Sequence, residues 1–148
     1  MTASLEVEGI SRSFGGVRAV DGVTLQLSPG EIVGLIGPNG AGKTTLFNVL
    51  TRLYRPDSGH ISFAGASLLG APPHRIVRRG IARTFQNVEL FRTMTVLENV
   101  LVGGHTRSRA FAGRAAARRA LEVLGYVGLA ELARRPVAGL PFGTLKRV

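Results

Sequence analysis

The residues with the clearest chemical potential in this chain lie together at positions 37–45, where the sequence reads GPNGAGKTT. Lys43, one of only two lysines, follows a glycine-rich loop in the pattern Gly-x-x-x-x-Gly-Lys-Thr. Glycines let the backbone curl until consecutive N–H groups point inward, and the lysine adds positive charge, so the pattern predicts a phosphate-binding loop. Thr44 offers a hydroxyl oxygen of the kind that Mg²⁺ prefers, and Thr45 offers a further hydrogen bond to phosphate. We expect the whole loop to contact a nucleotide: Gly37, Pro38, Asn39, Gly40, Ala41, Gly42, Lys43, Thr44 and Thr45.

Two flanking elements must hold this loop in place. Residues 31–36 are almost entirely apolar, which predicts a strand covered on both faces. Pro29-Gly30 predicts a tight turn, and so a hairpin between this strand and the one expected at 23–27. Residues 44–53 have helical spacing, with an apolar stripe at Leu46, Val49, Leu50 and Leu53. A helix that begins here points the positive end of its dipole at a bound phosphate, and strand, loop and helix together form the setting that the motif requires.

The remaining elements divide the chain into a strand-rich half and a helical half. Further strands are predicted at 5–10, 60–63 and 81–85. Helices are predicted at 73–79 (ended by Gly80), 95–102, 114–127 and 129–134. Thr95 and Glu98 form a capping-box pattern, and the stripe of the 114–127 helix is Ala117, Leu121, Leu124 and Val127. This order predicts an α/β core with a helical appendage.

Composition narrows the class of protein further. The 148 residues are 45% hydrophobic and 19% charged, which is a globular balance. The chain contains no cysteine, so disulfides and thiolate metal sites are excluded. The N-terminal residues lack a signal pattern, and no apolar run approaches the ~20 residues of a membrane span. The net charge of +10 comes from scattered arginines, which favours a solvated basic surface over a nucleic-acid interface.

Several motifs together resemble the ATP-binding subunits of ABC transporters, over essentially the whole chain. The string GPNGAGKTTL is similar to their Walker A motif, and RTFQ, ending at Gln86, resembles their Q-loop. Phe14, in RSFGGVRAVDGVTL, lies where the family places an aromatic that stacks on adenine. The string LFNVLT, the stretch RTFQNVELFRTMTVLENV and an LPFG-type signature resemble the importers of branched-chain amino acids. The signature segment would be Leu140, Pro141, Phe142, Gly143 and Thr144.

The resemblance implies a fold and a set of residue roles. The fold is an α/β P-loop NTPase core with an antiparallel β subdomain and a helical subdomain, with residues 1–148 forming part of a nucleotide-binding domain whose C-terminal half is absent. We expect residues 1–86 to form the β subdomain and P-loop core, and residues 87–148 the helical subdomain up to the signature. ATP and Mg²⁺ are the implied cofactors, with Lys43 and Gln86 in catalysis and Thr44 and Gln86 at the metal. The signature would contact ATP held by the opposite protomer, but Pro141 has neither hydroxyl nor N–H, which leaves the Gly143 and Thr144 N–H groups as candidate donors.

The resemblance also implies partners and a location. These are transmembrane permease subunits, faced by residues 87–95, a second ATP-binding subunit (homodimer or heterodimer), and indirectly a solute-binding protein. The chain would lie on the cytoplasmic face of the plasma membrane, held peripherally by the permease. We expect no nucleic-acid partner.

The acidic residues needed for hydrolysis are not found in the sequence. No aspartate follows Arg83, and none of the later glutamates ends an apolar run, so no Walker B carboxylate is recognised, and no histidine follows His105. The parent family hydrolyses ATP, but we expect this chain to be inactive alone, and to be poorly stable or to oligomerise because strand edges are left unpaired. Two alternatives stay open: a non-catalytic nucleotide-binding fragment, and a soluble P-loop ATPase that acts on nucleic acid.

Overall fold

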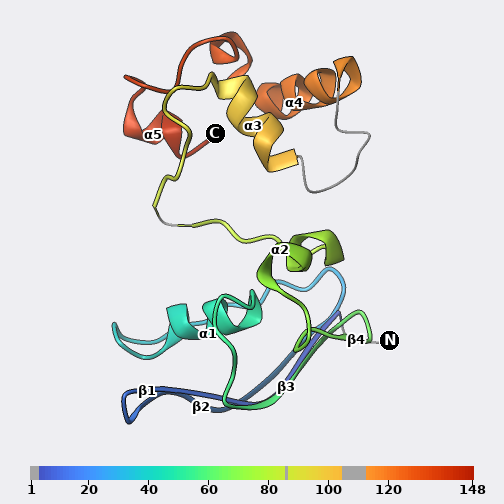
Figure 1. Cartoon of the computed structure of the whole chain (residues 1–148), viewed down its shortest axis with the longest axis vertical. Helices are drawn as coiled ribbons and strands as arrows, with labels where there is room; N and C mark the ends of the chain where they lie inside the picture. The colour runs from blue at the N-terminus through green and yellow to red at the C-terminus, as the bar shows by residue number, and fades with distance from the viewer. Residues whose placement is uncertain (1–3, 86, 105–112) are drawn as a thin grey trace. The chain divides into compact units, whose positions relative to one another are not determined.

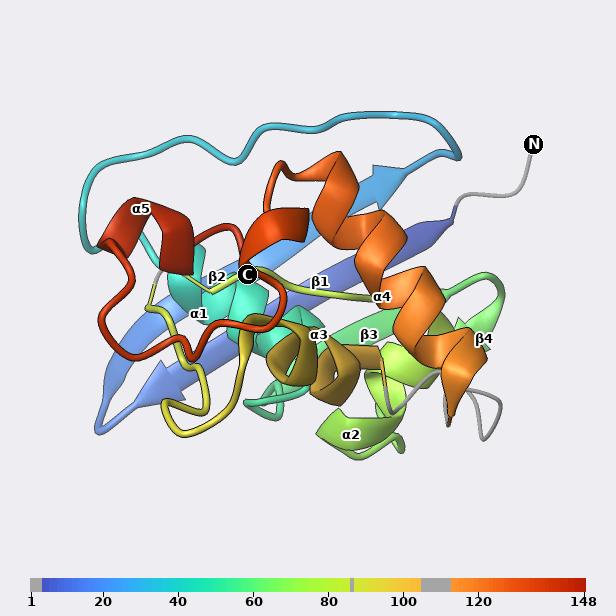
Figure 2. The ribbon, with the colours of Figure 1, turned by 90° about the horizontal axis from the view of Figure 1, so that it is seen from above.

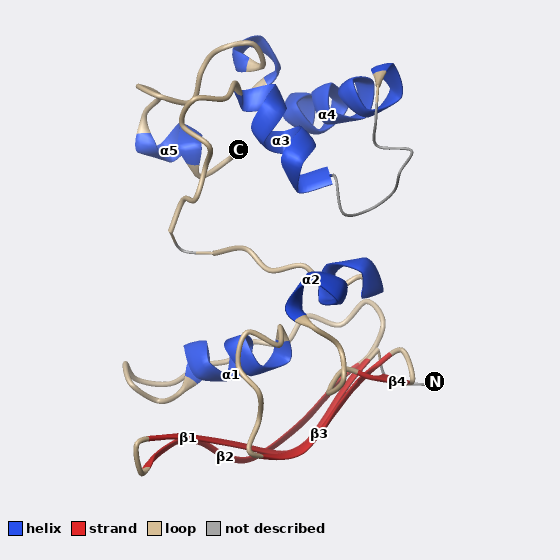
Figure 3. Cartoon of the chain, in the orientation of Figure 1, coloured by secondary structure: helices blue, strands red, loops and turns tan. Residues whose placement is uncertain are grey.

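The computed structural model describes residues 4–85, 87–104 and 113–148. The chain divides into two compact units, Met1–Arg83 and Thr84–Val148, which are drawn in Figure 1. The described strands all lie in the first unit, and α4, the longest of the described helices, lies in the second (Figure 3). None of the described helices is long and apolar enough to cross a membrane.

The first unit is built on a four-stranded antiparallel sheet. Its strands are β1 (Leu5–Phe14), β2 (Val17–Leu27), β3 (Ser58–Phe63) and β4 (Ala66–Ser67), in the order β2-β1-β3-β4. Val7, Ile10, Val20 and Ile61 are all buried in one core, and the strand irregularity between Val7 and Ile10 lets both residues reach it. The strands predicted at 5–10, 23–27 and 60–63 are confirmed, each within a longer strand.

Helices cover the apolar face of this sheet. Helix α1 (Lys43–Leu50) packs Leu46 and Val49 against the strand residues in one hydrophobic core, and it lies across β1 and β2 in both Figure 1 and Figure 2. Helix α2 (Pro73–Ile76) and the 3₁₀ turn η1 (Val77–Arg79) add Ile76 to that core, and Gly80 ends them with a φ of 98°. The predicted 73–79 helix and its glycine stop are therefore confirmed. Leu53 lies beyond α1 and is exposed, so the predicted stripe was too long.

Two predicted strands do not form. Residues 31–36 have no strand structure, and Ile32 and Ile36 are 98% and 92% exposed. The turn at Pro29-Gly30 does form, closed by a hydrogen bond from Glu31 N–H to the Ser28 carbonyl, but no hairpin follows it. Residues 81–85 also lack strand structure. An all-apolar strand needs partner strands beside it and cover on both faces, and the described residues place neither around residues 31–36.

The second unit is helical. It contains α3 (Val96–Gly104), α4 (Arg114–Tyr126), the 3₁₀ turn η2 (Ala130–Leu132) and the short α5 (Phe142–Leu145). The capping box before α3 is confirmed, because Thr95 N–H donates to Glu98 Oε2 at 2.7 Å and Glu98 N–H donates to Thr95 Oγ1 at 3.2 Å. A core of buried apolar residues joins these elements: Val96, Leu124, Leu129, Ala133 and Val137.

The apolar stripe of α4 differs from the predicted one. Its buried residues are Ala116, Ala120 and Leu124, whereas Leu121 is 41% exposed. Helix α4 packs closely against α3, and small alanine side chains permit such an approach. Sequence patterning favoured the larger leucine, but the packed face uses the alanines one residue before the predicted positions.

Candidate functional site

The glycine-rich loop is tied to the sheet at its last residue. Gly42 precedes α1 with a φ of 81°, in the left-handed region that favours glycine. A Cβ atom added at Gly42 would overlap the carbonyl oxygen of Ala19 on β2. Only glycine therefore fits between the start of α1 and the strand below it, and this close approach sets where the helix begins.

Lys43 folds back across the loop that it follows. Its Nζ donates hydrogen bonds to the carbonyl oxygens of Gly37 at 2.6 Å and Pro38 at 2.7 Å. Ala41 N–H donates to the same Pro38 carbonyl at 3.2 Å and closes the turn of the loop. The predicted residues Gly37 to Lys43 are thus brought together in one compact loop with the ammonium group at its centre.

The start of α1 is free to receive an anion. Its first turn holds no acidic side chain, and no side chain caps it. The first N–H groups of a helix have no partner within the helix and carry its positive dipole end. Leu46 N–H makes the first helical bond, to Gly42 at 2.8 Å, so the N–H groups of Lys43, Thr44 and Thr45 are the ones directed out of the helix.

These residues also fit a magnesium ion that arrives with a nucleotide. Thr44 is exposed in the first turn of α1, and its hydroxyl is one oxygen ligand. The described residues contain no cluster of three acidic or histidine side chains that could hold a metal by itself. Mg²⁺ commonly takes one or two protein oxygens, with phosphate and water completing its coordination, so the set suits an ion bound together with phosphates and not before them.

Phe14 lies at the end of β1, in the same unit as the loop. Its side chain is 39% exposed, and it pairs with Val17 across the turn between β1 and β2. That turn and the start of α1 lie at the same end of the sheet in Figures 1 and 2. Tyr54 meets the Phe14 ring edge-on, at 5.2 Å between centroids. An exposed aromatic face therefore lies on the strand pair that also supports Gly42.

Gln86 lies outside the described residues, but the arginine three positions before it is well anchored. Arg83 Nη1 donates to Asn48 Oδ1 on α1 at 2.6 Å, and its guanidinium lies 5.8 Å from the centroid of the Phe47 ring. The segment that leads to Gln86 is thereby tied to the helix that follows the phosphate loop. Sequence reasoning missed this link, although a polar Asn48 among apolar neighbours on α1 was a usable signal.

The signature candidates lie in the second unit. Pro141 directly precedes α5, and Leu140 packs against the core of that unit. Phe142 is 61% exposed, with Lys146 Nζ 4.8 Å from its ring centroid. Thr144 N–H donates to the Pro141 carbonyl at 2.9 Å within α5. The backbone N–H of Thr144 is thus already used, which corrects the sequence-based suggestion that it could serve as a free donor.

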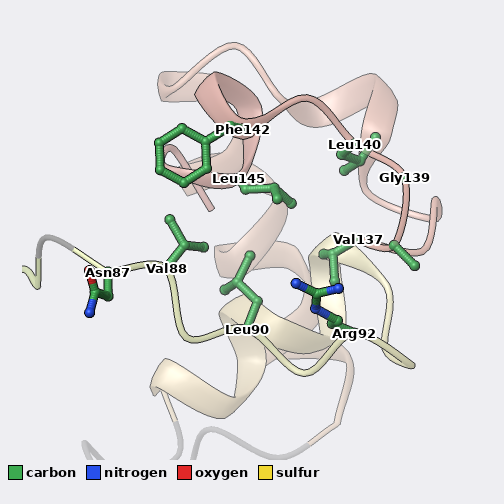
Figure 4. Close-up of a pocket in the computed structure, with 10 residues that line it drawn as sticks. Asn87, Val88, Leu90, Arg92, Val137, Gly139, Leu140, Phe142 and Leu145 are labelled. Atoms are coloured by element: carbon green, nitrogen blue, oxygen red, sulfur yellow. The ribbon is translucent and has the colours of Figure 1, made fainter.

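A pocket of about 350 Å³ joins two segments of the second unit (Figure 4). One side comes from the segment that begins at Asn87 and the other from the segment that ends in α5. Apolar side chains dominate it, with Arg92 at its edge. The labelled lining residues are Asn87, Val88, Leu90, Arg92, Val137, Gly139, Leu140, Phe142 and Leu145.

A buried amide fixes one wall of this pocket. Asn99 on α3 is 7% exposed, and its Oδ1 accepts from Phe91 N–H at 2.8 Å. Its Nδ2 donates to the carbonyl oxygens of Phe91 at 3.2 Å and Thr95 at 2.9 Å. Asn99 therefore shapes the turn between Leu90 and Thr95 from within. The sequence analysis missed it because an asparagine in a helix reads as an exposed residue.

Hydrogen bonds from backbone N–H groups lower the pKa of two carboxyl groups. The pKa of Asp57 lies below its ordinary value, chiefly because the Ser13 N–H donates to the carboxylate and also because Arg12 lies beside it. The pKa of Glu98 is lowered mainly by the Thr95 N–H and then by the Thr95 hydroxyl. Both carboxylates thus help to hold the ends of β1 and α3.

Comparison with known proteins decides the family. Residues 20–148 match the family model described as ABC transporter. The chain belongs to the ABC transporter family. This ABC transporter chain is 46% identical to the high-affinity branched-chain amino acid transport ATP-binding protein LivG of Escherichia coli K12, and 43% identical to its counterpart BraF of Pseudomonas aeruginosa. Each alignment covers 97% of this chain and 62% of the relative, so the chain spans less than two thirds of these curated proteins.

A solved structure agrees with the fold. The ADP conformation of MJ1267, an ATP-binding cassette of an ABC transporter, matches this ABC transporter chain with a TM-score of 0.84 and 31% sequence identity. The match covers 99% of this chain and 63% of the MJ1267 chain. The predicted fold class, a P-loop ABC ATPase fold with an antiparallel β part and a helical part, is confirmed.

Proposed function

We propose that this ABC transporter chain binds ATP with Mg²⁺ and forms part of the energy-coupling subunit of an importer for branched-chain amino acids. The observation that carries the proposal is the loop before α1. There Lys43 Nζ donates hydrogen bonds to the Gly37 and Pro38 carbonyls, and Gly42 lies so close to the Ala19 carbonyl that only glycine fits. The names of LivG and BraF, which are ATP-binding proteins of branched-chain amino acid transport, supply the solute class.

Different residues bind different parts of the nucleotide. The N–H groups at the start of α1 and the Lys43 ammonium bind the phosphates, because both present positive charge at one point. The Thr44 hydroxyl would hold Mg²⁺, and the ion would supply positive charge beside the phosphates. Phe14 stacks on the adenine ring, since every base offers a π-face to an aromatic side chain. Gln86 would respond to the γ-phosphate and metal.

The proposed partners are those expected for an ATP-binding subunit of an ABC transporter. A second ATP-binding subunit would present its signature to this ATP, and Leu140 to Thr144 would face the partner's ATP in return. A transmembrane permease would contact residues 87–95, whose turn is held by Asn99. A solute-binding protein would act on the permease. The permease would also hold this chain peripherally on the cytoplasmic face of the plasma membrane.

Calorimetric titration of the chain with ATP and Mg²⁺ tests this function. Lys43→Ala removes charge-assisted hydrogen bonds to phosphate and should weaken ATP binding roughly ten- to a hundredfold. Lys146→Ala is the matched control, because Lys146 is the only other lysine and lies in the second unit. Equal affinities of wild type and Lys43→Ala would overturn the assignment of the phosphate loop.

A further inference from the structure

The Phe14 ring is not an isolated aromatic at the end of a strand. The Arg12 guanidinium lies over the ring, 4.7 Å from its centroid. Tyr54 approaches with its ring at 70° to that of Phe14. Arg12 and Phe14 are two residues apart on β1 and so project from the same side of the strand. The Phe14 ring therefore has a cation over one face and a second aromatic ring in T-shaped contact with it.

Arg12 is itself held in place by Asp57. Its Nη1 forms an ion pair with Asp57 Oδ1 at 2.6 Å, and its side chain is only 27% exposed. The other carboxylate oxygen accepts from Ser13 N–H at 2.7 Å, and Asp57 N–H donates to the Ser11 carbonyl at 2.8 Å. Asp57 thus binds three consecutive residues of β1 and sets where the guanidinium lies.

We propose that Arg12 and Asp57 are positioning residues for the nucleotide base. Arg12 occupies one face of Phe14, so a base stacks only on the opposite face, and Asp57 fixes Arg12 in that arrangement. The inference rests on the proposed function, since it assumes that Phe14 receives adenine. A ring fixed before binding loses less rotamer freedom on binding, which favours affinity.

The ion pair with Asp57 also keeps the Arg12 guanidinium from binding the triphosphate. A free arginine this close to a nucleotide site would be drawn to the triphosphate, because guanidinium binds phosphate strongly. Asp57 pairs with Arg12 Nη1, and the contact between Gly42 and Ala19 places the phosphate loop on β2. Arg12 therefore acts on the base through Phe14, and the triphosphate is left to Lys43 and the start of α1.

The test compares a ligand that has a base with one that lacks it. Binding of Mg²⁺-ATP and Mg²⁺-tripolyphosphate to the 148-residue chain is measured by calorimetry for wild type, Arg12→Ala, Arg12→Gln and Arg12→Lys. A contact between a cation and an aromatic face is worth about 0.5–1 kcal/mol at exposed sites. Arg12→Ala and Arg12→Gln should therefore weaken ATP binding about two- to fivefold and leave tripolyphosphate binding unchanged. Arg12→Lys keeps a cation and should recover part of the loss.

An arginine–aspartate pair on the same hairpin supplies the control. Arg18 pairs with Asp21 at 2.9 Å, but its guanidinium is largely exposed and does not lie on Phe14. Arg18→Ala should leave both affinities unchanged. Transferred nuclear Overhauser effects between phenylalanine ring protons and adenine H2 or H8 add a direct readout, which should weaken in Asp57→Asn because the ring loses its support. This second variant keeps the test decisive if Arg12→Ala does not fold.

The outcomes distinguish a failure of the role given to Arg12 from a failure of the proposed ATP-binding function. If wild type binds neither ligand, or binds ATP independently of Lys43, both the proposed function and this inference are wrong. If ATP binding depends on Lys43 but the ratio of ATP to tripolyphosphate affinity is the same in Arg12→Gln and wild type, only the inference is wrong. Tighter ATP binding in Arg12→Ala would also overturn it, because the guanidinium would then occupy the face that the base needs.

Discussion

The Lys43 ammonium group lies 2.6 Å from the carbonyl oxygen of Gly37, six residues earlier in the chain. Lysine thus closes the loop on itself and places its charge where the loop surrounds a ligand. Lys43 and the loop before it therefore form one hydrogen-bonded unit, and under the proposed function a phosphate would meet a cation held in position.

Replacing Gly42 should damage the loop through two separate effects. Gly42→Ala places a Cβ atom on the Ala19 carbonyl oxygen and forces a side chain into the left-handed region. Left-handed strain alone costs about 1–3 kcal/mol, and the overlap adds to it. Urea unfolding should show a loss above that range, together with weaker ATP binding.

Gly30→Ala is the matched control for that measurement. Gly30 has a similar φ of 79°, but a Cβ atom there meets nothing within 4 Å. The difference between the two variants isolates the overlap with Ala19. Equal losses in both would show that β2 does not restrict the start of α1.

Asn99→Leu should destabilise the second unit by about 1–3 kcal/mol, because the Phe91 N–H loses its acceptor and the Phe91 and Thr95 carbonyls each lose one of two donors. Leucine has nearly the same size, so packing is kept while the hydrogen bonds are lost. Amide hydrogen exchange should show faster exchange at Phe91. Asn87→Leu, at an exposed position, should leave it unchanged, and slow exchange in Asn99→Leu would contradict the role given to the amide.

Acid should weaken the fold through Asp57 and Glu98. Both carboxyls have a folded pKa below the unfolded values of 3.8 and 4.5. A depressed folded pKa gives stability that is present above the unfolded pKa and lost as pH falls through the folded pKa. The urea midpoint should therefore be constant near pH 6 and fall below about pH 4.5.

The double variant Asp57→Asn, Glu98→Gln checks that assignment. It should have a lower urea midpoint than wild type at pH 6 and a smaller further loss on acidification. A wild-type acid loss that is unchanged in the double variant would assign the pH dependence to other groups.

The exposed apolar run should make the chain self-associate. Ile32 and Ile36 are almost fully exposed, and unpaired extended apolar segments favour aggregation. Ile32→Lys with Ile36→Lys should reduce association in sedimentation velocity, while the free energy of unfolding stays within about 0.5 kcal/mol of wild type. Tyr126→Lys changes an equally exposed residue on α4 and should not reduce association. A monomeric wild-type chain at high concentration would remove the basis for this prediction.

The elements that sequence predicted well are those with local determinants. The Thr95–Glu98 capping box, the glycine stop at Gly80 and the turn at Pro29-Gly30 all act between residues close in sequence, and each is present. The glycine-rich loop is likewise closed by residues a few positions apart, since Lys43 donates to Gly37 and Pro38, while its binding of phosphate stays a prediction.

The features that sequence missed depend on distant partners. Residues 31–36 have the composition of a buried strand, but composition does not supply the neighbouring strands that burial requires. The buried face of α4 depends on what packs against it, and it uses Ala116 and Ala120 in place of Leu121. Arg12 and Asp57 are 45 positions apart, so no local pattern could pair them.

The contact between Gly42 and Ala19 has a consequence for which ligands fit. β2 supports the phosphate loop at Ala19 and is hydrogen-bonded to the strand that ends in Phe14. The separation between the aromatic ring and the loop is therefore set through the antiparallel sheet. If Phe14 and the loop bind one nucleotide as proposed, its base and phosphates must be separated by that length.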